Sequence, residues 1–286
     1  MIVQTDKFSD ADIARFRERQ QTSFNILEKA ATRLVGGETE KDVAHQLVKD
    51  YYASGAASFF HLPVVLFGDR AGLPGDWSIG KFYPKKKTLQ DSESVILDAS
   101  PIYDGYLVDT SFSFCFGENE AHREMMIHLS HYRKSILSAV NKGDELKQIA
   151  SSVINRMEEN GYQPAHTKHV GEVLGHRAIK IKKFPIQPRI KGFDALAISW
   201  FNIKDKLAMS GLGNQSPLWN TLKSSEHRAH DGLWLVEPHA GKDDVGAKWE
   251  EIMVIENGQG RWLEDTPPHV RQWQQIEAGK SYAPPM

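Results

Sequence analysis

Two aspartates stand inside apolar, strand-like runs, and this feature constrains the chain more than any other. Asp98 lies in the run VILDA and Asp109 lies in the run YLVDT. Strands this apolar are expected to be buried on both faces, where an ionised carboxylate costs free energy unless it is paired or bound to a metal ion. The sequence therefore predicts either a buried hydrogen-bonding network or a cation at this place.

The residues between the two runs, Asp104-Gly105, are typical of a type I′ turn. A two-residue loop here pairs residues whose numbers sum to 209, as 104 and 105 do, so that Asp98 lies opposite Ser111. By the same rule Asp109 lies opposite Ser100. The aspartates are then diagonal neighbours on one face, about 7–8 Å apart at the backbone. Like charges this close repel, so either one carboxyl is protonated or a cation lies between them. The alternative is an exposed hairpin, or a buried aspartate bonded to Ser or Thr.

Two later runs repeat the anomaly. Glu237 ends the apolar run GLWLVEP, and Glu250 and Glu251 open the run WEEIMVI. Each alone is typical of a strand-end charge that reaches water, but four acidic residues entering apolar strands are harder to explain in that way. Together with histidine, such carboxylates suit divalent ions such as Mn²⁺, Co²⁺, Zn²⁺ or Fe²⁺.

The segment HVGEVLGH offers His169 and His176 as nitrogen ligands. Seven residues apart, they would point to opposite faces of a regular strand, so we expect a bulge at Gly171 or Gly175. His166 lies three residues before His169 and either supports a ligand or contacts substrate, or is a solvated loop residue, which is the expectation preferred here.

The rest of the chain predicts helices and strands in mixed order. We expect helices over residues 9–35, 39–55, 118–140 and 144–160, and strands over 58–68 and near 168–182, 232–238 and 248–255. Residues 184–228 show no clean period and suggest an insertion or a lid, whose aromatic residues Trp200, Phe201 and Trp219 either line a pocket or belong to the core. Without βαβ regularity, the order predicts an α+β fold in a single domain, residues 1–286.

Composition excludes several classes of protein. The chain has 286 residues with 35 basic and 37 acidic side chains, a formal charge of −2, which gives no basic surface for nucleic acid or membranes. Cys115 is the one cysteine, which excludes a disulfide framework. No apolar run reaches the roughly 18 residues that span a bilayer, and no secretory signal is visible, so we expect a cytoplasmic protein.

Taken in order, these residues resemble the pita-bread metallopeptidases, the superfamily of methionine aminopeptidase, aminopeptidase P, prolidase and creatinase. VILDASPIYDGYLVDTSFSFCFG is similar to the family's two-aspartate hairpin, LWLVEPHAG to its glutamate–proline strand and AKWEEIMVIENG to its closing strand. The resemblance covers about residues 94–263, and helices within 9–54 fit the family's layout more loosely. It implies a curved antiparallel sheet flanked by helices.

The resemblance also implies a centre of two divalent metal ions, of manganese, cobalt, zinc or iron. The implied ligands are Asp98, Asp109, His169, Glu237 and Glu250. Asp109 and Glu250 would bridge the ions. His169 and Glu237 would bind one ion, and Asp98 the other. Glu250 is preferred to Glu251 because it directly follows the aromatic residue, as in the family's strand.

The implied reaction is hydrolysis by a hydroxide that bridges the two ions. Glu237 would carry a proton from the attacking water to the leaving amine, and His176 would contact substrate or the transition state. We expect an aminopeptidase or an Xaa-Pro-type peptidase, acting on a peptide or a small amide. The alternatives are a creatinase-like hydrolase of a non-peptide C–N bond on the same metal site, and a binding protein without catalysis.

Four features depart from the family's pattern. Its peptidases usually carry a histidine about seventeen or eighteen residues before the first aspartate, where this chain has Gly80 and Lys81; the nearest upstream histidine is His61. KHVGEVLGH replaces the usual GHGIG context, and Arg177 stands where an acidic residue is expected. Only about ninety residues precede Asp98, so the separate N-terminal domain of prolidase-like relatives is not expected, and substrate access and a homodimer stay open.

Overall fold

The computed structural model describes residues 3–76, 78–182, 189–190, 192–212 and 216–279. Its helices are α1 Asp10–Arg33, α2 Glu40–Ala53, α3 Glu120–Lys142, α4 Leu146–Glu159, α5 Ala195–Met209 and α6 Pro268–Glu277. Short 3₁₀ helices cover Gly68–Gly72, Ile79–Lys81, Ala165–Lys168 and Lys223–Ser225. Within the described residues, no helix is both long and apolar enough to cross a membrane.

The first two helices begin where the sequence predicts. Ser9 Oγ accepts a hydrogen bond from the Asp12 backbone N–H, and the Asp12 carboxylate accepts one from the Ser9 backbone N–H, which forms the capping box of α1. Thr39 caps α2 through the backbone of Asp42 in the same way. These caps satisfy N–H groups that the first helical turn leaves without partners.

The strands form three sheets. The largest runs β1 (Val3–Gln4), β8 (Lys180–Ile181), β4 (Tyr106–Leu107), β3 (Glu93–Tyr103), β2 (Ser58–Phe67), β10 (Phe193–Asp194) and β9 (Arg189–Ile190), with β5 (Thr110–Phe116) also on β3. The second runs β11 (Leu218–Trp219), β7 (Gly175–Arg177), β12 (Gly232–Val236), β15 (Glu251–Glu256) and β16 (Gln259–Trp262). The third runs β14 (Val245–Lys248), β13 (His239–Lys242) and β6 (Gln163–Pro164).

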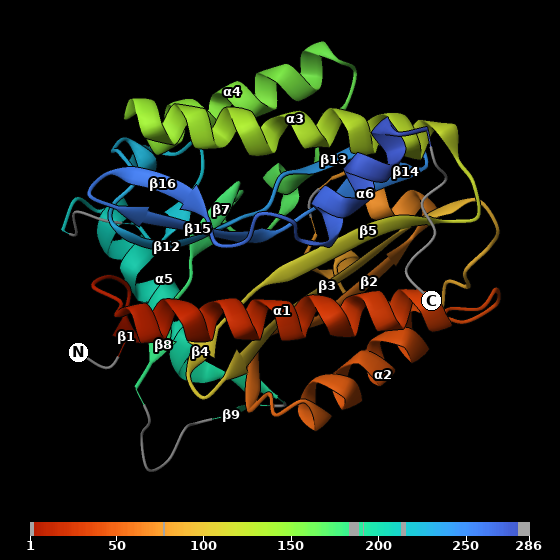
Figure 1. Ribbon diagram of the computed structural model, residues 1–286, viewed down its shortest axis with the longest axis horizontal. Coiled ribbons are helices and arrows are strands. Elements are labelled where there is room, and N and C mark those ends of the chain that lie inside the picture. The colour runs from red at the N-terminus through yellow and green to blue at the C-terminus, as the bar shows by residue number, and fades with distance from the viewer. Residues whose placement is uncertain (1–2, 77, 183–188, 191, 213–215, 280–286) are drawn as a thin grey trace.

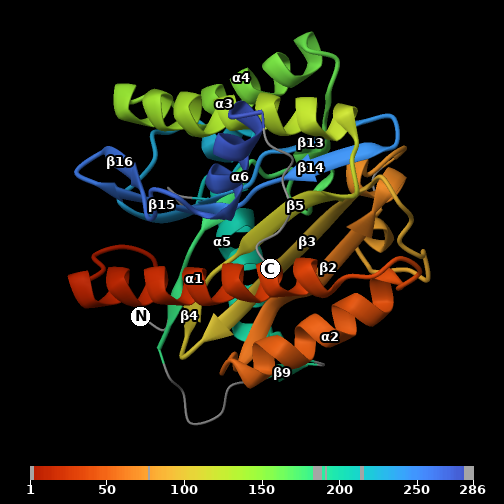
Figure 2. The same ribbon diagram turned by 45° about the vertical axis from the view of Figure 1, so that its right-hand side comes forward.

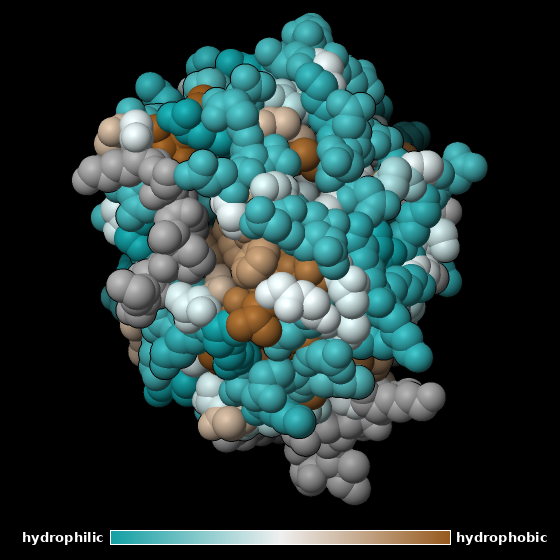
Figure 3. All heavy atoms as spheres, turned by 90° about the vertical axis from the view of Figure 1, so that its right-hand side faces the viewer, coloured by the Kyte–Doolittle hydropathy of each residue, from teal (hydrophilic) through white to brown (hydrophobic). Residues whose placement is uncertain are grey.

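Helices cover the sheets from two sides (Figures 1 and 2). Helices α1 and α2 lie along β2–β5 on one side, and α3 and α4 lie over the C-terminal strands on the other. Each side has its own apolar core, one containing Phe16, Leu47 and Phe112, the other containing Met125, Trp234 and Trp249. The two large sheets meet where Ser111 of β5 bridges Glu250. This arrangement is the predicted α+β class, with sheets enclosed between helices. One outer face is shown in Figure 3, where hydrophilic residues surround a recessed apolar patch.

Two segments contain helices for which the sequence carries no prediction. The 184–228 region contains a helix, α5, among whose described residues only Ala197 and Phe201 are buried. Some residues within this region or next to it lie outside the described part of the chain, namely 183–188, 191 and 213–215. The Pro-rich tail forms α6, which buries His269, Trp273 and Ile276 against the second core.

Candidate metal centre

The two aspartates lie on one hairpin, as the sequence predicts. Strand β3 pairs with β5 and β4 so that Asp98 faces Ser111, and Tyr103 faces Tyr106 across the turn. The turn residues Asp104-Gly105 have φ angles of 51° and 90°, the positive values that a type I′ turn requires. The predicted register is confirmed, and both carboxylates are buried, 6% and 1% exposed.

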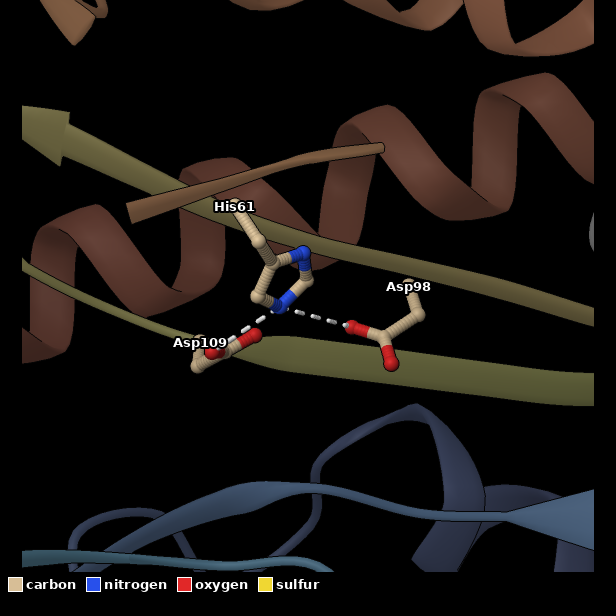
Figure 4. A group of neighbouring side chains, drawn as sticks. All are labelled: His61, Asp98 and Asp109. Carbon is tan, nitrogen blue, oxygen red and sulfur yellow. Dashed lines mark ion pairs between the residues drawn. The ribbon is translucent and has the colours of Figure 1, made fainter. Parts of the chain in front are cut away.

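A histidine from the neighbouring strand reaches both carboxylates (Figure 4). His61 Nε2 is 3.2 Å from Asp109 Oδ2 and 3.7 Å from Asp98 Oδ1. The pairing of β2 with β3 shifts register on both sides of His61, and this irregularity directs its side chain to the aspartates. His61 Nδ1 donates a hydrogen bond to the Leu62 carbonyl at 3.0 Å, so that Nε2 is the atom facing the carboxylates.

The environment of His61 favours positive charge. Burial alone would lower its pKa, but the charges of Asp109 and Asp98 outweigh burial and raise the pKa to about 9. The His61 side chain is 33% exposed, whereas those of Asp98 and Asp109 are 9% and 2% exposed. Solvent therefore reaches this group of side chains at His61.

A lysine lies on the other side of Asp98. Lys248 Nζ is 2.6 Å from Asp98 Oδ2, 2.9 Å from Glu237 Oε2 and 2.9 Å from Glu250 Oε2. We call Asp98, Asp109, Glu237 and Glu250 the carboxylate cluster. Burial would lower the pKa of Lys248, but the cluster's charges raise it well above its usual value, so Lys248 is an ammonium ion.

A hydrogen-bonded chain of histidines supports Glu237. His239 Nε2 donates to the Ala71 carbonyl at 2.6 Å, and its Nδ1 accepts from His169 Nε2 at 3.0 Å. His169 Nδ1 lies 2.8 Å from Glu237 Oε2. Both ring nitrogens of His169 therefore have partners. Burial would raise the pKa of Glu237, but Lys248 and His169 hold it well below its usual range, so Glu237 is a carboxylate.

The second predicted histidine faces the cluster directly. His176 Nδ1 donates to the Arg177 carbonyl at 3.1 Å, which leaves Nε2 facing Asp109 Oδ2 at 3.5 Å and Glu250 Oε1 at 3.7 Å. The rings of Phe60 and Phe201 pack against His176, with centroids 5.8 and 5.5 Å away. Apolar neighbours on one side and carboxylates on the other hold this imidazole in one orientation.

The adjacent glutamates point in opposite directions. Glu250 lies in the cluster, whereas Glu251 pairs with Arg133 Nε at 2.6 Å and with His269 Nε2 at 2.9 Å. An extended backbone turns successive side chains to opposite faces, so only one of the two can face the cluster.

The donor set fits a divalent cation. Asp98 Oδ1, Asp109 Oδ1 and Glu250 Oε1 are buried and have no hydrogen-bond partner within the described part of the chain. Burial, and then the charge of Asp109, raises the pKa of Glu250 well above its usual value. Two sets of three ligand atoms lie close enough to share an ion: His61, Asp98 and Asp109, and Asp109, His176 and Glu250. Carboxylates and imidazoles are the ligands that such ions take.

The structure thus brings His176 and the five ligands implied by the resemblance into one region, and adds others. His61, Lys248 and His239 contact the cluster or its partners, and the sequence did not indicate them. The position of Lys248 could have been predicted, because it stands two residues before Glu250 in an extended segment and its side chain therefore faces the same side. The contacts of His61 and His239 could not have been predicted in this way, because they depend on pairing between strands that are distant in the sequence.

Some expectations about neighbouring residues were wrong. His169 is not on a bulged strand but follows the 3₁₀ helix Ala165–Lys168, and a turn with positive φ at Gly171 leads back to the sheet at β7. His166 is not solvated but fully buried, and burial lowers its pKa to about 4.

The other singled-out side chains have separate surroundings. Trp219 is a core residue that donates to the Leu146 carbonyl, whereas Phe201 contacts His176 and Trp200 packs on Phe201. Arg177 packs over the Trp234 ring and donates to the Asp231 carbonyl.

Comparisons with known proteins find relatives that are named as peptidases. The chain is 27% identical over 172 residues to an uncharacterized peptidase of Staphylococcus aureus (strain bovine RF122), which is 58% of this chain and 46% of the relative. An uncharacterized peptidase of Staphylococcus saprophyticus is 26% identical over the same lengths. The chain thus spans about half the length of the curated relatives it matches.

Solved structures show the same fold. The prolidase from Pyrococcus horikoshii superposes with a TM-score of 0.64 at 17% identity, over 92% of this chain and 64% of that one. The X-Pro aminopeptidase from Thermotoga maritima gives 0.65 at 17% identity, over 92% and 63%. Aminopeptidase P from Escherichia coli gives 0.59 at 14% identity, over 96% and 61%. The fold is therefore the α+β pita-bread fold.

The family model of metallopeptidase family M24 matches residues 14–196, which is more than half of the chain. The match includes the two-aspartate hairpin, His169 and His176, while Glu237 and Glu250 lie beyond it. Members of this family use divalent metal ions. The chain belongs to metallopeptidase family M24.

Proposed function

We propose that this chain is a metal-dependent hydrolase that cleaves the N-terminal amide bond of a peptide, with Xaa-Pro peptides as the preferred class. The observation that carries the proposal is the buried carboxylate cluster, four of whose oxygens have no hydrogen-bond partner within the described residues. Structural neighbours that are named as prolidase and X-Pro aminopeptidase support the choice of substrate.

The cluster supplies what this hydrolysis needs. A divalent ion bound there would acidify a water molecule and polarise the scissile carbonyl. Glu237, held as a carboxylate by Lys248 and His169, can accept the proton of the attacking water and pass it to the leaving amine. His176 directs Nε2 into the cluster, where it can hydrogen-bond the oxygen on which negative charge develops.

The aromatic residues beside His176 form the wall of this proposed site. Phe60 and Phe201 pack together with ring centroids 4.8 Å apart, and both contact His176. Such a wall suits the pyrrolidine ring of proline, which is apolar and donates no hydrogen bond after acylation.

The carboxylate ligands we propose are Asp98 and Asp109, with Glu250 beside them in the cluster. The arrangement with two ions and five ligands, which adds His169, Glu237 and Glu250, stays a prediction. It requires His169 to exchange its contact with His239 or Glu237 for a metal ion, and Lys248 to leave Glu237 and Glu250.

The experiment is a turnover assay on protein stripped with chelator and reloaded with Mn²⁺ or Co²⁺. We expect release of the N-terminal residue from Ala-Pro and Met-initiated peptides, complete loss of turnover after chelation, and recovery on reloading. N-acetylated versions of the same peptides serve as the matched control and should not be cleaved. Absence of turnover on the whole peptide panel with metal bound would contradict the proposal.

A further inference from the structure

One side of the carboxylate cluster already has its cation. An ammonium group has three N–H donors, and Lys248 places one oxygen each of Asp98, Glu237 and Glu250 within 2.6–2.9 Å of Nζ. The lysine is 3% exposed, so water does not compete for these contacts. Lys248 therefore stands where a divalent ion shared by these carboxylates would lie.

The same side has no nitrogen ligand to spare. His169 uses one ring nitrogen on Glu237 and the other on His239, and His239 is fixed in turn by the Ala71 carbonyl. A histidine binds a metal ion through a ring nitrogen whose lone pair is free. His169 would have to break one of these two contacts to become a ligand.

The opposite side has the reverse arrangement. Asp98 Oδ1 and Asp109 Oδ1 are buried without hydrogen-bond partners in the described part of the chain. His61 donates from Nδ1 to a backbone carbonyl, so Nε2 is the nitrogen that faces the two carboxylates, and an ion that displaces its proton would bind there. Such a backbone contact is what fixes a ligating imidazole in proteins.

The spacing of these atoms fits one ion. Ligands of a tetrahedral ion lie about 3.3–3.4 Å apart when each bond is about 2.0–2.1 Å long. His61 Nε2 lies 3.2 Å from Asp109 Oδ2 and 3.7 Å from Asp98 Oδ1. The three groups converge in Figure 4, on the side where His61 is open to solvent.

We propose that this chain binds a single divalent ion, held by His61, Asp98 and Asp109, and that the Lys248 ammonium takes the place of the second ion. Charge supports this number. With all four carboxyls ionised the cluster carries four negative charges, of which Lys248 neutralises one and a single divalent ion two more. A second divalent ion beside Lys248 would leave a buried excess of positive charge, which is unfavourable. The proposal deepens the proposed function, because it rests on the same metal dependence and names the ion's ligands.

The experiment measures metal per chain by elemental analysis, on full-length protein stripped with chelator, reloaded with Mn²⁺ or Co²⁺ and dialysed. We expect about one ion in the wild type, nearly none in His61→Ala, and about one in His169→Ala. His45→Ala, at an exposed position of α2, is the matched control and should keep one ion. Circular dichroism checks that each variant is folded.

The lysine is tested in the same assay. Lys248→Met removes the ammonium and keeps most of the side-chain volume, and we expect its metal content to rise above one ion per chain. Lys242→Met, at an exposed position of β13, should leave the metal content unchanged. The wild-type stoichiometry decides the matter even where Lys248→Met does not fold.

Two ions per wild-type chain, or loss of metal in His169→Ala with retention in His61→Ala, would overturn the inference. These outcomes are separable from the proposed function. Two ions with chelator-sensitive peptide turnover would remove the inference and leave the function. One ion without turnover on any peptide would contradict the proposed function and leave the inference.

Discussion

Glu250 and Glu251 are neighbours in the chain, both buried, yet they belong to clusters of different character. Glu251 contacts Arg133 and His269 at 2.6 and 2.9 Å, so its charge is matched. Glu250 shares one lysine with two other carboxylates, and its Oε1 has no hydrogen-bond partner within the described chain. Glu251, Arg133 and His269, which we call the Glu251 cluster, have the partners that a structural ion pair needs. The carboxylate cluster around Glu250 lacks them.

This difference distinguishes residues that stabilise the fold from residues that are available to bind an ion. Buried polar groups in native proteins are nearly always hydrogen-bonded, so unpartnered ones need an explanation. Strongly perturbed carboxylates gather at sites that bind ligands or ions, where the protein leaves charge to be met by something else. The Glu251 cluster should therefore determine stability, and the carboxylate cluster should determine metal binding.

The largest expected effect is on metal binding. Asp109→Asn removes the carboxylate that both candidate sets of ligands share. Because losing even an indirect partner of a ligand costs about 10–100-fold in metal affinity, loss of this ligand should cost more than about 100-fold. Metal content by elemental analysis checks this, with the exposed Asp244→Asn as control. Unchanged metal content in Asp109→Asn would show that the cluster is not a metal site.

The next effect is on stability. Glu251→Gln leaves Arg133 and His269 without their charged partner, and breaking a buried ion pair costs about 3–5 kcal/mol. We expect a decrease of about 3 kcal/mol in the free energy of unfolding by denaturant titration, with metal content unchanged. Glu256→Gln, on the exposed end of β15, is the control and should change stability by less than about 0.5 kcal/mol. Loss of metal without loss of stability would reverse the roles given to the two glutamates.

The third effect is on rate. His176→Ala removes an imidazole that faces the cluster without being needed to hold the ion, so kcat should fall by about 10²-fold while metal content is kept. His131→Ala, exposed on α3, should leave both unchanged. If His176→Ala lost metal and rate together, His176 would be a ligand.

The smallest expected effect is an increase in the stability of the metal-free protein. Glu250→Gln relieves the repulsion between Glu250 and Asp109, which together with burial raises the pKa of Glu250. In metal-free protein we expect the free energy of unfolding to increase by about 1 kcal/mol. With Mn²⁺ present both proteins should gain binding free energy, because Glu250 is not among the ligands of the ion. A less stable metal-free Glu250→Gln would mean that the Lys248 pair, not the repulsion, dominates at this position.

The sequence was most informative where the determinants were local. The hairpin register followed from the Asp104-Gly105 turn alone, since a two-residue turn fixes every later pair. The helix caps at Ser9 and Thr39 depend on residues three apart, and the predicted helix ranges begin at these two residues. The family resemblance pointed to the cluster because its acidic residues stand in apolar runs.

The remainder depends on contacts that no local pattern carries. Helix α5 exposes Ile203, Leu207 and Met209, so its apolar residues do not form one stripe and the helical period is hidden. Helix α6 does carry the period, with buried His269, Trp273 and Ile276, but the prolines at its start hid it, although proline is suited to the first helical turn. His61 reaches the aspartates only because β2 is irregular against β3.

The most direct measurement is an anomalous difference map from crystals of the wild-type protein soaked in Mn²⁺. We predict one peak per chain, bonded to His61, Asp98 and Asp109, with Lys248 still in contact with Glu237 and Glu250. Two peaks, with His169 and Glu237 bonded to one of them and Lys248 displaced, would contradict this account.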